Sequence, residues 1–290
     1  MVILSNLWCR SVGRLVARLV LKGVDMQTVS HYSLDSHHRK AIDAIVRSLP
    51  TPLSVDDAAN KTEFGASFID HLVIDKALDY GIPYSFKYEQ NGAIVQNIFP
   101  IPKLASEQIS SSSTVELSLH TEVAFHCDRP DSLILFCVRA DENAGTTYAE
   151  LREILKIIPR WAIEQLKQPN FSFDIDLSFV MNGSPTEQTI QSIFNETLSE
   201  MTYDYQAVSA LTNDAQLALH YLEQAIRICT KVVYLRSGDF LVLPNRQALH
   251  GRTKFSPRFD GTDRWLKRVI VRQNSRPIQS VDDVNILGAE

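Results

Sequence analysis

The sequence predicts a mainly β fold, in which an antiparallel double-sheet barrel carries helices on its outside. Helical periodicity comes early in the chain, apolar strand-like runs fill the middle, and strands return near the end. The 290 residues contain no repeat, low-complexity tract or long linker, and 44% of them are hydrophobic. That length and composition suit one domain with a large core, expected over residues 26–290.

Residues 1–25 differ in character from the rest of the chain. Basic residues recur at every fourth position from Arg10 to Lys22, apolar residues lie between them, and no acidic residue precedes Asp25. This pattern is typical of a basic amphipathic helix, which can touch a membrane surface or serve as a transit peptide. The simpler interpretation is an N-terminal extension outside the fold, with Met26 beginning an ordinary domain.

The first half of the domain is expected to hold two helices followed by strands. Ser36 can cap a helix that Pro50 ends, and a second helix is expected over residues 66–78. Residues 93–99 (AIVQNIF) have the composition of a strand. Residues 133–138 (LILFCV) form a continuous apolar run, which indicates a strand buried on both faces.

The second half mixes the helical and the strand periods. Residues 148–158 have a helical pattern, and residues 187–200 include another helical piece. Asn213 can cap a further helix. Residues 232–243 hold two apolar runs around a Ser-Gly-Asp turn, which is typical of a hairpin, and residues 268–272 (RVIVR) form the last clear strand.

Charge and cysteine content narrow the class of protein. The formal net charge of −5 argues against nucleic acid as the main partner. The four cysteines show no C-x-x-C spacing and do not suit a disulfide framework, so a reducing cytoplasm is expected. No stretch reaches the roughly 18 apolar residues that a transmembrane segment needs.

Three residues form a candidate metal site. His120 and Glu122 are two positions apart, so on a strand their side chains point to the same face. With His250 they can make a facial triad, which holds Fe(II) and leaves positions open for a co-substrate and O2. Arg264, which follows the second histidine, can pair with the carboxylate of an acidic co-substrate. The blander interpretations are a chance His-x-Glu pair and a loop histidine bonded to a backbone carbonyl.

Three segments give this pattern a family resemblance. Residues 120–126 (HTEVAFH), 250–255 (HGRTKF) and 257–268 (PRFDGTDRWLKR) resemble the clavaminate synthase-like family, over roughly residues 90–275. The resemblance implies a double-stranded β-helix, or jelly-roll, core and an oxygenase that depends on Fe(II) and 2-oxoglutarate. Many members hydroxylate free or carrier-linked L-amino acids, arginine and asparagine among them.

Carried over to this sequence, the triad would bind iron and Arg264 would clamp the distal carboxylate of 2-oxoglutarate. Thr146, in a stretch that resembles the family's Thr-x-x-Ala pattern, would lie beside the same carboxylate, with Thr147 as the alternative. The simpler roles are a surface ion pair of Arg264 with Asp260 or Asp263, and a helix cap for Thr146.

The resemblance also implies substrate-binding residues. Arg268 matches a family arginine that binds the substrate carboxylate, and Gln96 resembles a glutamine near the substrate amino group, which Glu122 would also contact. Residues 185–212 would form an active-site lid, where the arginine hydroxylases place two acids on the guanidinium. Here Asp204 matches one acid and Gln206 replaces the other, which weakens the case for arginine. Each of these residues could instead be a solvated or structural polar group.

The expected activity is hydroxylation of an unactivated C–H bond, at Cβ or Cγ of a free L-amino acid, with succinate and CO2 as co-products. Because related halogenases lose the metal-binding carboxylate, Glu122 favours hydroxylation over halogenation. Desaturation or ring closure by the same chemistry stays open. A non-catalytic metal- or ligand-binding barrel and a zinc hydrolase are the alternatives, although the sequence has no H-E-x-x-H helix.

Overall fold

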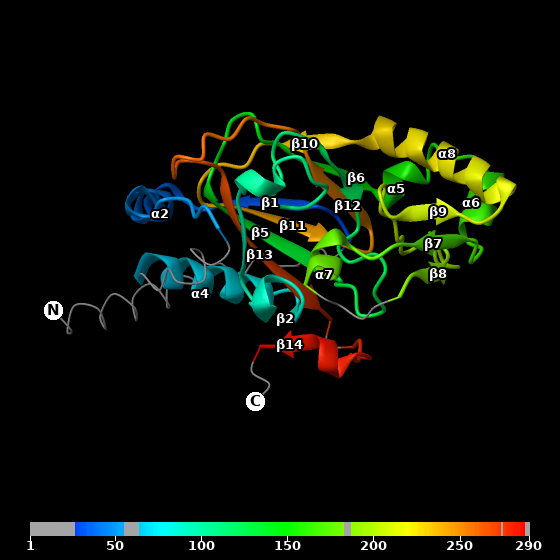
Figure 1. Cartoon of the computed structure of the whole chain (residues 1–290), viewed down its shortest axis with the longest axis horizontal. Helices are drawn as coiled ribbons and strands as arrows, with labels where there is room; N and C mark the ends of the chain where they lie inside the picture. Colours follow the sequence, from blue (N-terminus) through cyan, green and yellow to red (C-terminus); the bar gives the residue numbers. More distant parts are fainter. Residues whose placement is uncertain (1–26, 55–63, 183–186, 274, 288–290) are drawn as a thin grey trace.

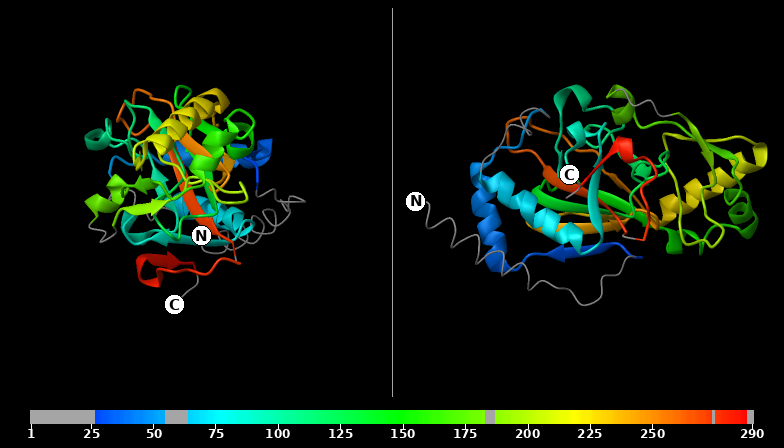
Figure 2. Two further views of the ribbon diagram at one scale, coloured as in Figure 1. Left: turned by 90° about the vertical axis from the view of Figure 1, so that its right-hand side faces the viewer. Right: turned by 90° about the horizontal axis from the view of Figure 1, so that it is seen from below.

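The computed structural model describes residues 27–54, 64–182, 187–273 and 275–287. Antiparallel strands form a seven-stranded, a four-stranded and a three-stranded sheet, with helices packed around them. Figure 1 shows α2 and α4 beside the seven-stranded sheet, while α5, α6 and α8 gather at the other end with the three-stranded sheet. The views in Figure 2 agree with this arrangement. The expected mixture of antiparallel sheets with outer helices is confirmed.

Strands recur along the whole described part of the chain, with helices between them. The α-helices are α2 (Ser36–Ser48), α4 (Phe64–Leu78), α5 (Leu151–Ile154), α6 (Arg160–Leu166), α7 (Leu177–Met181) and α8 (Asn213–Cys229). The strands are β1 (Ser30–Ser33), β2 (Ile82–Phe86), β3 (Gln96–Ile98), β4 (Leu117–His120), β5 (Ser132–Arg139), β6 (Thr146–Glu150), β7 (Phe171–Phe173), β8 (Thr189–Gln191), β9 (Val208–Ala210), β10 (Lys231–Val233), β11 (Asp239–Pro244), β12 (Ala248–Arg252), β13 (Trp265–Arg272) and β14 (Val284–Ile286). Short 3-10 turns are Gln90–Gly92, Pro102–Leu104 and Val281–Asp283.

The sheets pair their strands in a non-sequential order. The seven-stranded sheet runs β1-β11-β5-β13-β2-β14, with β3 also paired to β13, and the four-stranded sheet runs β10-β6-β12-β4. The three-stranded sheet runs β8-β7-β9. The two candidate metal-binding histidines therefore belong to the small four-stranded sheet, whereas Arg268 belongs to the large one.

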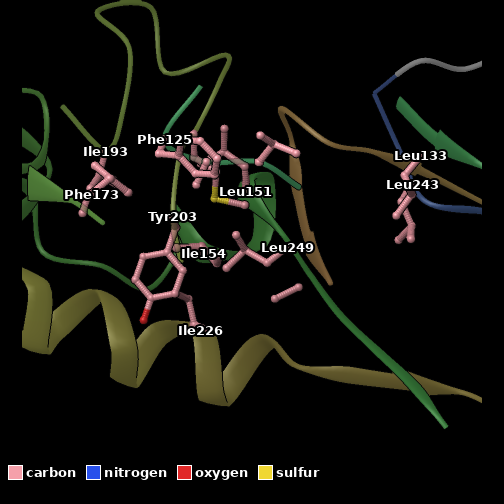
Figure 3. Close-up of a cluster of buried hydrophobic side chains, with 14 of the residues drawn as sticks. Phe125, Leu133, Leu151, Ile154, Phe173, Ile193, Tyr203, Ile226, Leu243 and Leu249 are labelled. Carbon is pink, nitrogen blue, oxygen red and sulfur yellow. The ribbon is translucent and has the colours of Figure 1, made fainter. Parts of the chain in front are cut away.

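Strand β5 separates two hydrophobic clusters, as its unbroken apolar sequence predicts. Its odd-numbered residues from Leu133 to Cys137 join the cluster that includes Leu249 of the other sheet. Figure 3 shows part of that cluster, with Ile226 on α8 and Tyr203 beside that helix. Its even-numbered residues, such as Phe136, join the cluster under α2 and α4. Alternation of side chains along one strand thus buries both faces.

The hairpin expected over residues 232–243 is wrong. Strand β10 pairs with β6 in the four-stranded sheet, whereas β11 pairs with β1 and β5 in the seven-stranded sheet. The chain turns at Gly238, whose φ of +85° suits glycine, and the Gly238 N–H donates to the Cys137 carbonyl. The segment between the strands therefore crosses from one sheet to the other, which local turn chemistry does not distinguish from a hairpin.

Two helices expected from periodicity are wrong in part. Residues 146–150 form β6, because pairing with both β10 and β12 overrides the helical pattern, and α5 begins only at Leu151. Residues 187–200 hold β8 and a turn in place of a helix. In that turn the Asn195 side chain accepts from the Ser199 and Glu200 backbone N–H groups. A local side-chain bond of this kind competes with helix formation.

The remaining elements differ from expectation only at their ends. The caps of α2 and α8 are Asp35 and Thr212, each one residue before the predicted cap, and Thr212 accepts from the Ala215 N–H. The expected strand at 93–99 shortens to β3, because a turn with positive φ at Asn91 precedes it. The last strand extends back to Trp265.

None of the helices in the described ranges is long and apolar enough to cross a membrane. Residues 1–25 lie outside the described residues.

Candidate active site

Strand pairing brings the two candidate histidines together from positions 130 residues apart. His120 ends β4 and His250 lies in β12, where they face each other as antiparallel partners with ring centroids 4.4 Å apart. Glu122 lies past the end of β4, in a turn and not on the strand as expected. The Asn245 side chain holds this turn by accepting from the Glu122 N–H at 2.6 Å and donating to its carbonyl at 3.1 Å.

The geometry of the three side chains fits a metal ion. Their ligand atoms all lie within 4.8 Å of one another, and His250 Nε2 is 3.2 Å from Glu122 Oε2. His120 Nδ1 donates to the Ser118 carbonyl at 2.8 Å, which leaves the lone pair on Nε2. A second bond of this kind is what orients metal-binding histidines.

The protonation states of His250 and Glu122 also suit metal ligands. Burial, reinforced by nearby His120, lowers the pKa of His250 to about 4, so its imidazole is neutral near pH 7. Burial disfavours the Glu122 carboxylate, but Arg268 and His250 outweigh that effect and hold its pKa well below the usual range. Burial also opposes charging of His120, yet Asp204 and Glu122 raise its pKa. A neutral imidazole and an ionised carboxylate bind metal without first losing a proton.

Arg264 and Thr146 meet in a narrow cavity that the triad also lines. This cavity has a volume of about 40 Å³, and Leu133 and Leu135 form part of its apolar wall. Arg264 is only 6% exposed and donates to Thr146 Oγ1 at 3.3 Å, so it is not a surface residue. Burial lowers the pKa of Arg264 to about 10, which leaves the guanidinium charged at neutral pH.

Arg268 lies at the centre of a buried polar network. It donates through Nη1 to Glu122 Oε1 at 2.6 Å, through Nε to Gln96 Oε1 at 2.7 Å, and through Nη2 to Glu89 Oε1 at 2.9 Å. Gln96 Nε2 also donates to Glu89 Oε2 at 3.3 Å. The network therefore joins Arg268, the candidate residue for binding the substrate carboxylate, to Glu122, a candidate iron ligand.

A larger cavity of about 200 Å³ opens beside the triad and is strongly acidic. Arg268 is its one lining lysine or arginine among the described residues, and it is already paired with carboxylates. The lining acids beyond the triad are Glu89, Asp174, Asp176 and Asp204. Burial and the neighbouring Asp204 raise the pKa of Asp176 to about 7.

Several known proteins are similar to this chain in sequence, although no family model matches it. The L-asparagine oxygenase of Streptomyces coelicolor is 32% identical over 245 residues, which cover 83% of this chain and 72% of that protein. The L-lysine 3-hydroxylase of Catenulispora acidiphila is 31% identical over 250 residues, covering 80% and 66%. Clavaminate synthase 2 of Streptomyces clavuligerus is 30% identical over 203 residues, covering 66% and 60%.

The chain belongs to the clavaminate synthase-like family of Fe(II)- and 2-oxoglutarate-dependent oxygenases. Two solved structures agree. The non-heme iron oxygenase OrfP, with Fe, succinate and (3R,4R)-dihydroxy-L-Arg, matches with a TM-score of 0.76 and 27% identity over 91% of this chain and 85% of that one. Asparagine oxygenase, with Fe(II), (2S,3S)-3-hydroxyasparagine and succinate, matches with a TM-score of 0.68 and 27% identity. That match covers 82% of this chain and 80% of that one. The chain spans 60–72% of the length of the three sequence relatives.

The structure brings together all the candidate residues that the sequence indicated, and others that it did not. His120, Glu122, His250, Arg264, Thr146, Arg268, Gln96 and Asp204 all lie in or beside the two cavities. Sequence reasoning missed Glu89 and Asp176. Glu89 precedes a tight turn and Asp176 precedes the short α7, and neither position carries a motif. Their role depends on the tertiary fold, which places them near Arg268 and Asp204.

Proposed function

We propose that this oxygenase hydroxylates an unactivated C–H bond at Cβ or Cγ of a free L-amino acid, with succinate and CO2 as co-products. The observation that carries this proposal is the convergence of the triad with Arg264 on one side and Arg268 on the other. Each arginine is buried and lies beside the candidate metal ligands. One arginine suits an acidic co-substrate, and the other suits the carboxylate of an amino acid.

In this proposal His120, Glu122 and His250 hold Fe(II), and their fit rests on the distances between their ligand atoms and on the protonation states of His250 and Glu122. Iron with 2-oxoglutarate and O2 supplies the oxidising power that breaks the C–H bond. Arg264 and Thr146 bind the distal carboxylate of 2-oxoglutarate in the narrow cavity. The apolar wall of that cavity excludes water, which strengthens the ion pair.

The network around Arg268 orients the substrate. Arg268 would pair with the substrate carboxylate, and Glu122 would offer a metal ion its Oε2, which lies 3.2 Å from His250 Nε2. Glu89, Gln96 and Glu122 then surround the position of the α-amino group with acceptors. Fixing both α-substituents in this way brings Cβ and Cγ, and not the end of the side chain, next to the triad.

The acidic cavity favours a substrate side chain that carries a positive charge. Asp174, Asp176 and Asp204 line it, and Arg268 does not offset them because Glu89 and Glu122 already pair with it. Asp204 uses one oxygen to accept from the Gln206 and Ala207 backbone N–H groups, which leaves its other oxygen for a ligand. Asp176 thus provides a second acid, in place of the one that Gln206 replaces. The proposed substrate is therefore a lysine-, ornithine- or arginine-like amino acid.

The proposal extends to the architecture. The seven-stranded and four-stranded sheets suit a double-stranded β-helix core, with the triad between them. Residues 26–290 would form one domain, residues 185–212 would act as a lid over the acidic cavity, and residues 1–25 would be an extension outside it.

The test is a coupled assay on a panel of free L-amino acids. Anaerobic protein with Fe(II) and 2-oxoglutarate is mixed with each amino acid, O2 is admitted, and succinate and product mass are measured together. The proposal expects succinate matched by a product one oxygen heavier, for a cationic amino acid. A product two hydrogens lighter would identify a desaturase or cyclase. Absence of succinate with every amino acid, in protein that holds iron, would favour the non-catalytic barrel.

A further inference from the structure

A third cavity lies where β13 ends, away from the candidate active site. Its volume is about 290 Å³, and the residues that line it include Asp128, Asp131 and four arginines, Arg129, Arg246, Arg272 and Arg276. Arg272 is the last residue of β13, four positions beyond Arg268 on the same face. At the rise of a strand this separates the two side chains by about 13 Å. The proposed oxygenase reaction assigns no part to the residues that line this cavity.

Three of the four arginines that line this cavity share two carboxylates. Arg246 donates to Asp131 Oδ1 at 2.5 Å and to Glu200 Oε2 at 3.0 Å. Arg276 pairs with the same two carboxylates, at 2.9 Å from Asp131 and through its Nη2 to Glu200. The Arg129 guanidinium lies 3.5 Å from Glu200. Asp131 and Glu200 are therefore already paired with these arginines.

The remaining acid at the cavity is occupied by backbone groups. Asp128 accepts from the Gln279 N–H at 2.9 Å and from the Ser280 N–H at 2.7 Å. Its own N–H donates to His126 Nδ1 at 3.0 Å, so this neighbouring histidine is also engaged. Asp128 thus holds a loop in place and does not pair with an arginine.

Arg272 is the arginine of this cavity that lacks a carboxylate. It is 7% exposed and lines the cavity, yet its guanidinium has no hydrogen-bond or ion-pair partner among the described residues. A guanidinium has five N–H donors, and no described protein group accepts from those of Arg272 at the cavity. Four arginines against Asp128, Asp131 and Glu200 also leave one positive charge uncompensated.

We propose that the cavity at Arg272 binds a small oxyanion of the carboxylate or phosphate type. The planar guanidinium matches two oxygens of such an anion in a bidentate pair. The anion neutralises the surplus charge and satisfies the donors that no described protein group reaches. Arg276, with 41% of its side chain exposed, lies at the cavity and gives the anion a charged entrance.

Calorimetric titration of the full chain tests this proposal. The protein is kept anaerobic with Fe(II) and 2-oxoglutarate bound, so that the active site is filled, and the ionic strength is held constant with sodium chloride. Inorganic phosphate and acetate are titrated separately. We expect saturable binding of at least one, a melting temperature about 3 °C higher at tenfold excess over Kd, and roughly 30-fold weaker binding in Arg272→Gln. Binding of one probe alone would identify which oxyanion type the cavity takes.

The matched control is Arg227→Gln, which removes an exposed arginine of α8 and should leave Kd unchanged. Failure of wild-type protein to bind either probe would overturn the proposal. So would unchanged binding in a folded Arg272→Gln protein. If that variant does not fold, Arg272→Lys keeps the charge but loses the fork, and unchanged affinity in it would overturn the proposal equally.

Discussion

At the scale of single residues, two of the three candidate metal ligands have protonation states that suit metal binding. Buried His250 stays neutral and Glu122 stays ionised, because burial acts on one and Arg268 on the other. The triad, Arg264 and Arg268 could be predicted from sequence because they lie in compact motifs. Glu89 and Asp176 could not, because their importance comes only from the partners that folding gives them.

Replacing Arg264 tests its assignment to 2-oxoglutarate. Arg264→Gln removes a buried charge-assisted pair, so the Kd of 2-oxoglutarate should rise about 100-fold, or roughly 2–3 kcal/mol, with iron binding little changed. Anaerobic titration of 2-oxoglutarate into the Fe(II) protein measures both. Arg258→Gln, in the same segment but half-exposed at its side chain, is the control. Equal affinities in all three proteins would remove Arg264 from the site.

Asp176 gives a pH-dependent stability. Burial raises its folded pKa from 3.8 to about 7, so its neutral form favours folding below about pH 4 and this contribution is lost as pH rises through 7. In metal-free protein, Asp176→Asn should raise the free energy of unfolding by roughly 2–4 kcal/mol at pH 8, and the gain should shrink as pH falls toward 4. Urea unfolding at several pH values measures this.

The control for that experiment is Asp174→Asn, because Asp174 is exposed and bonds Gln188. It should show no gain at any pH. A gain in Asp176→Asn that is the same at pH 5 and pH 8 would show that its carboxyl does not titrate near pH 7.

At the scale of elements, the pairing of β12 with β4 and β6 is what assembles the triad. Predictions held for elements with one dominant signal, such as α4, β5 and the helix at α8. They failed where two signals competed. The helical period of residues 148–150 lost to strand pairing on both sides, while residues 151–154 kept it as α5. The turn at Gly238 connects strands of two different sheets and does not form a hairpin.

Gly251 shows how closely these strands approach beside His250. A Cβ atom there would lie 2.5 Å from the Leu117 carbonyl oxygen and 2.9 Å from Thr147 Oγ1. Gly251→Ala should therefore shift β12 from β4 and weaken iron binding by about tenfold or more, a cost of roughly 1–3 kcal/mol from overpacking. Equilibrium dialysis of Fe(II) measures it, and a folded variant with wild-type iron affinity would contradict this role of the close approach.

At the scale of the whole molecule, the two larger sheets bring residues of distant segments to one place. His120 and His250 come from the four-stranded sheet, and Arg268 from the seven-stranded sheet. The mixture of antiparallel sheets with outer helices could be predicted, because single segments such as residues 66–78 and 133–138 carry a clear helical or strand pattern. Which strands pair could not be predicted, because the sheet order depends on contacts between segments far apart.

Removal of residues 1–25 tests the domain boundary. If the domain begins at Met26, the shortened protein should have a melting temperature within about 1 °C of the full chain, since no domain contact is lost. Thermal unfolding followed by circular dichroism measures it. A large drop would place the segment inside the folded unit.

The central claim is that the triad and Arg264 form an iron and 2-oxoglutarate site. The most direct measurement adds 2-oxoglutarate to the anaerobic Fe(II) protein and records the visible metal-to-ligand charge-transfer band. We predict that the band appears in wild-type protein and saturates with one 2-oxoglutarate per chain, and that His250→Ala abolishes it. Wild-type protein that binds one iron and shows no band would contradict the account.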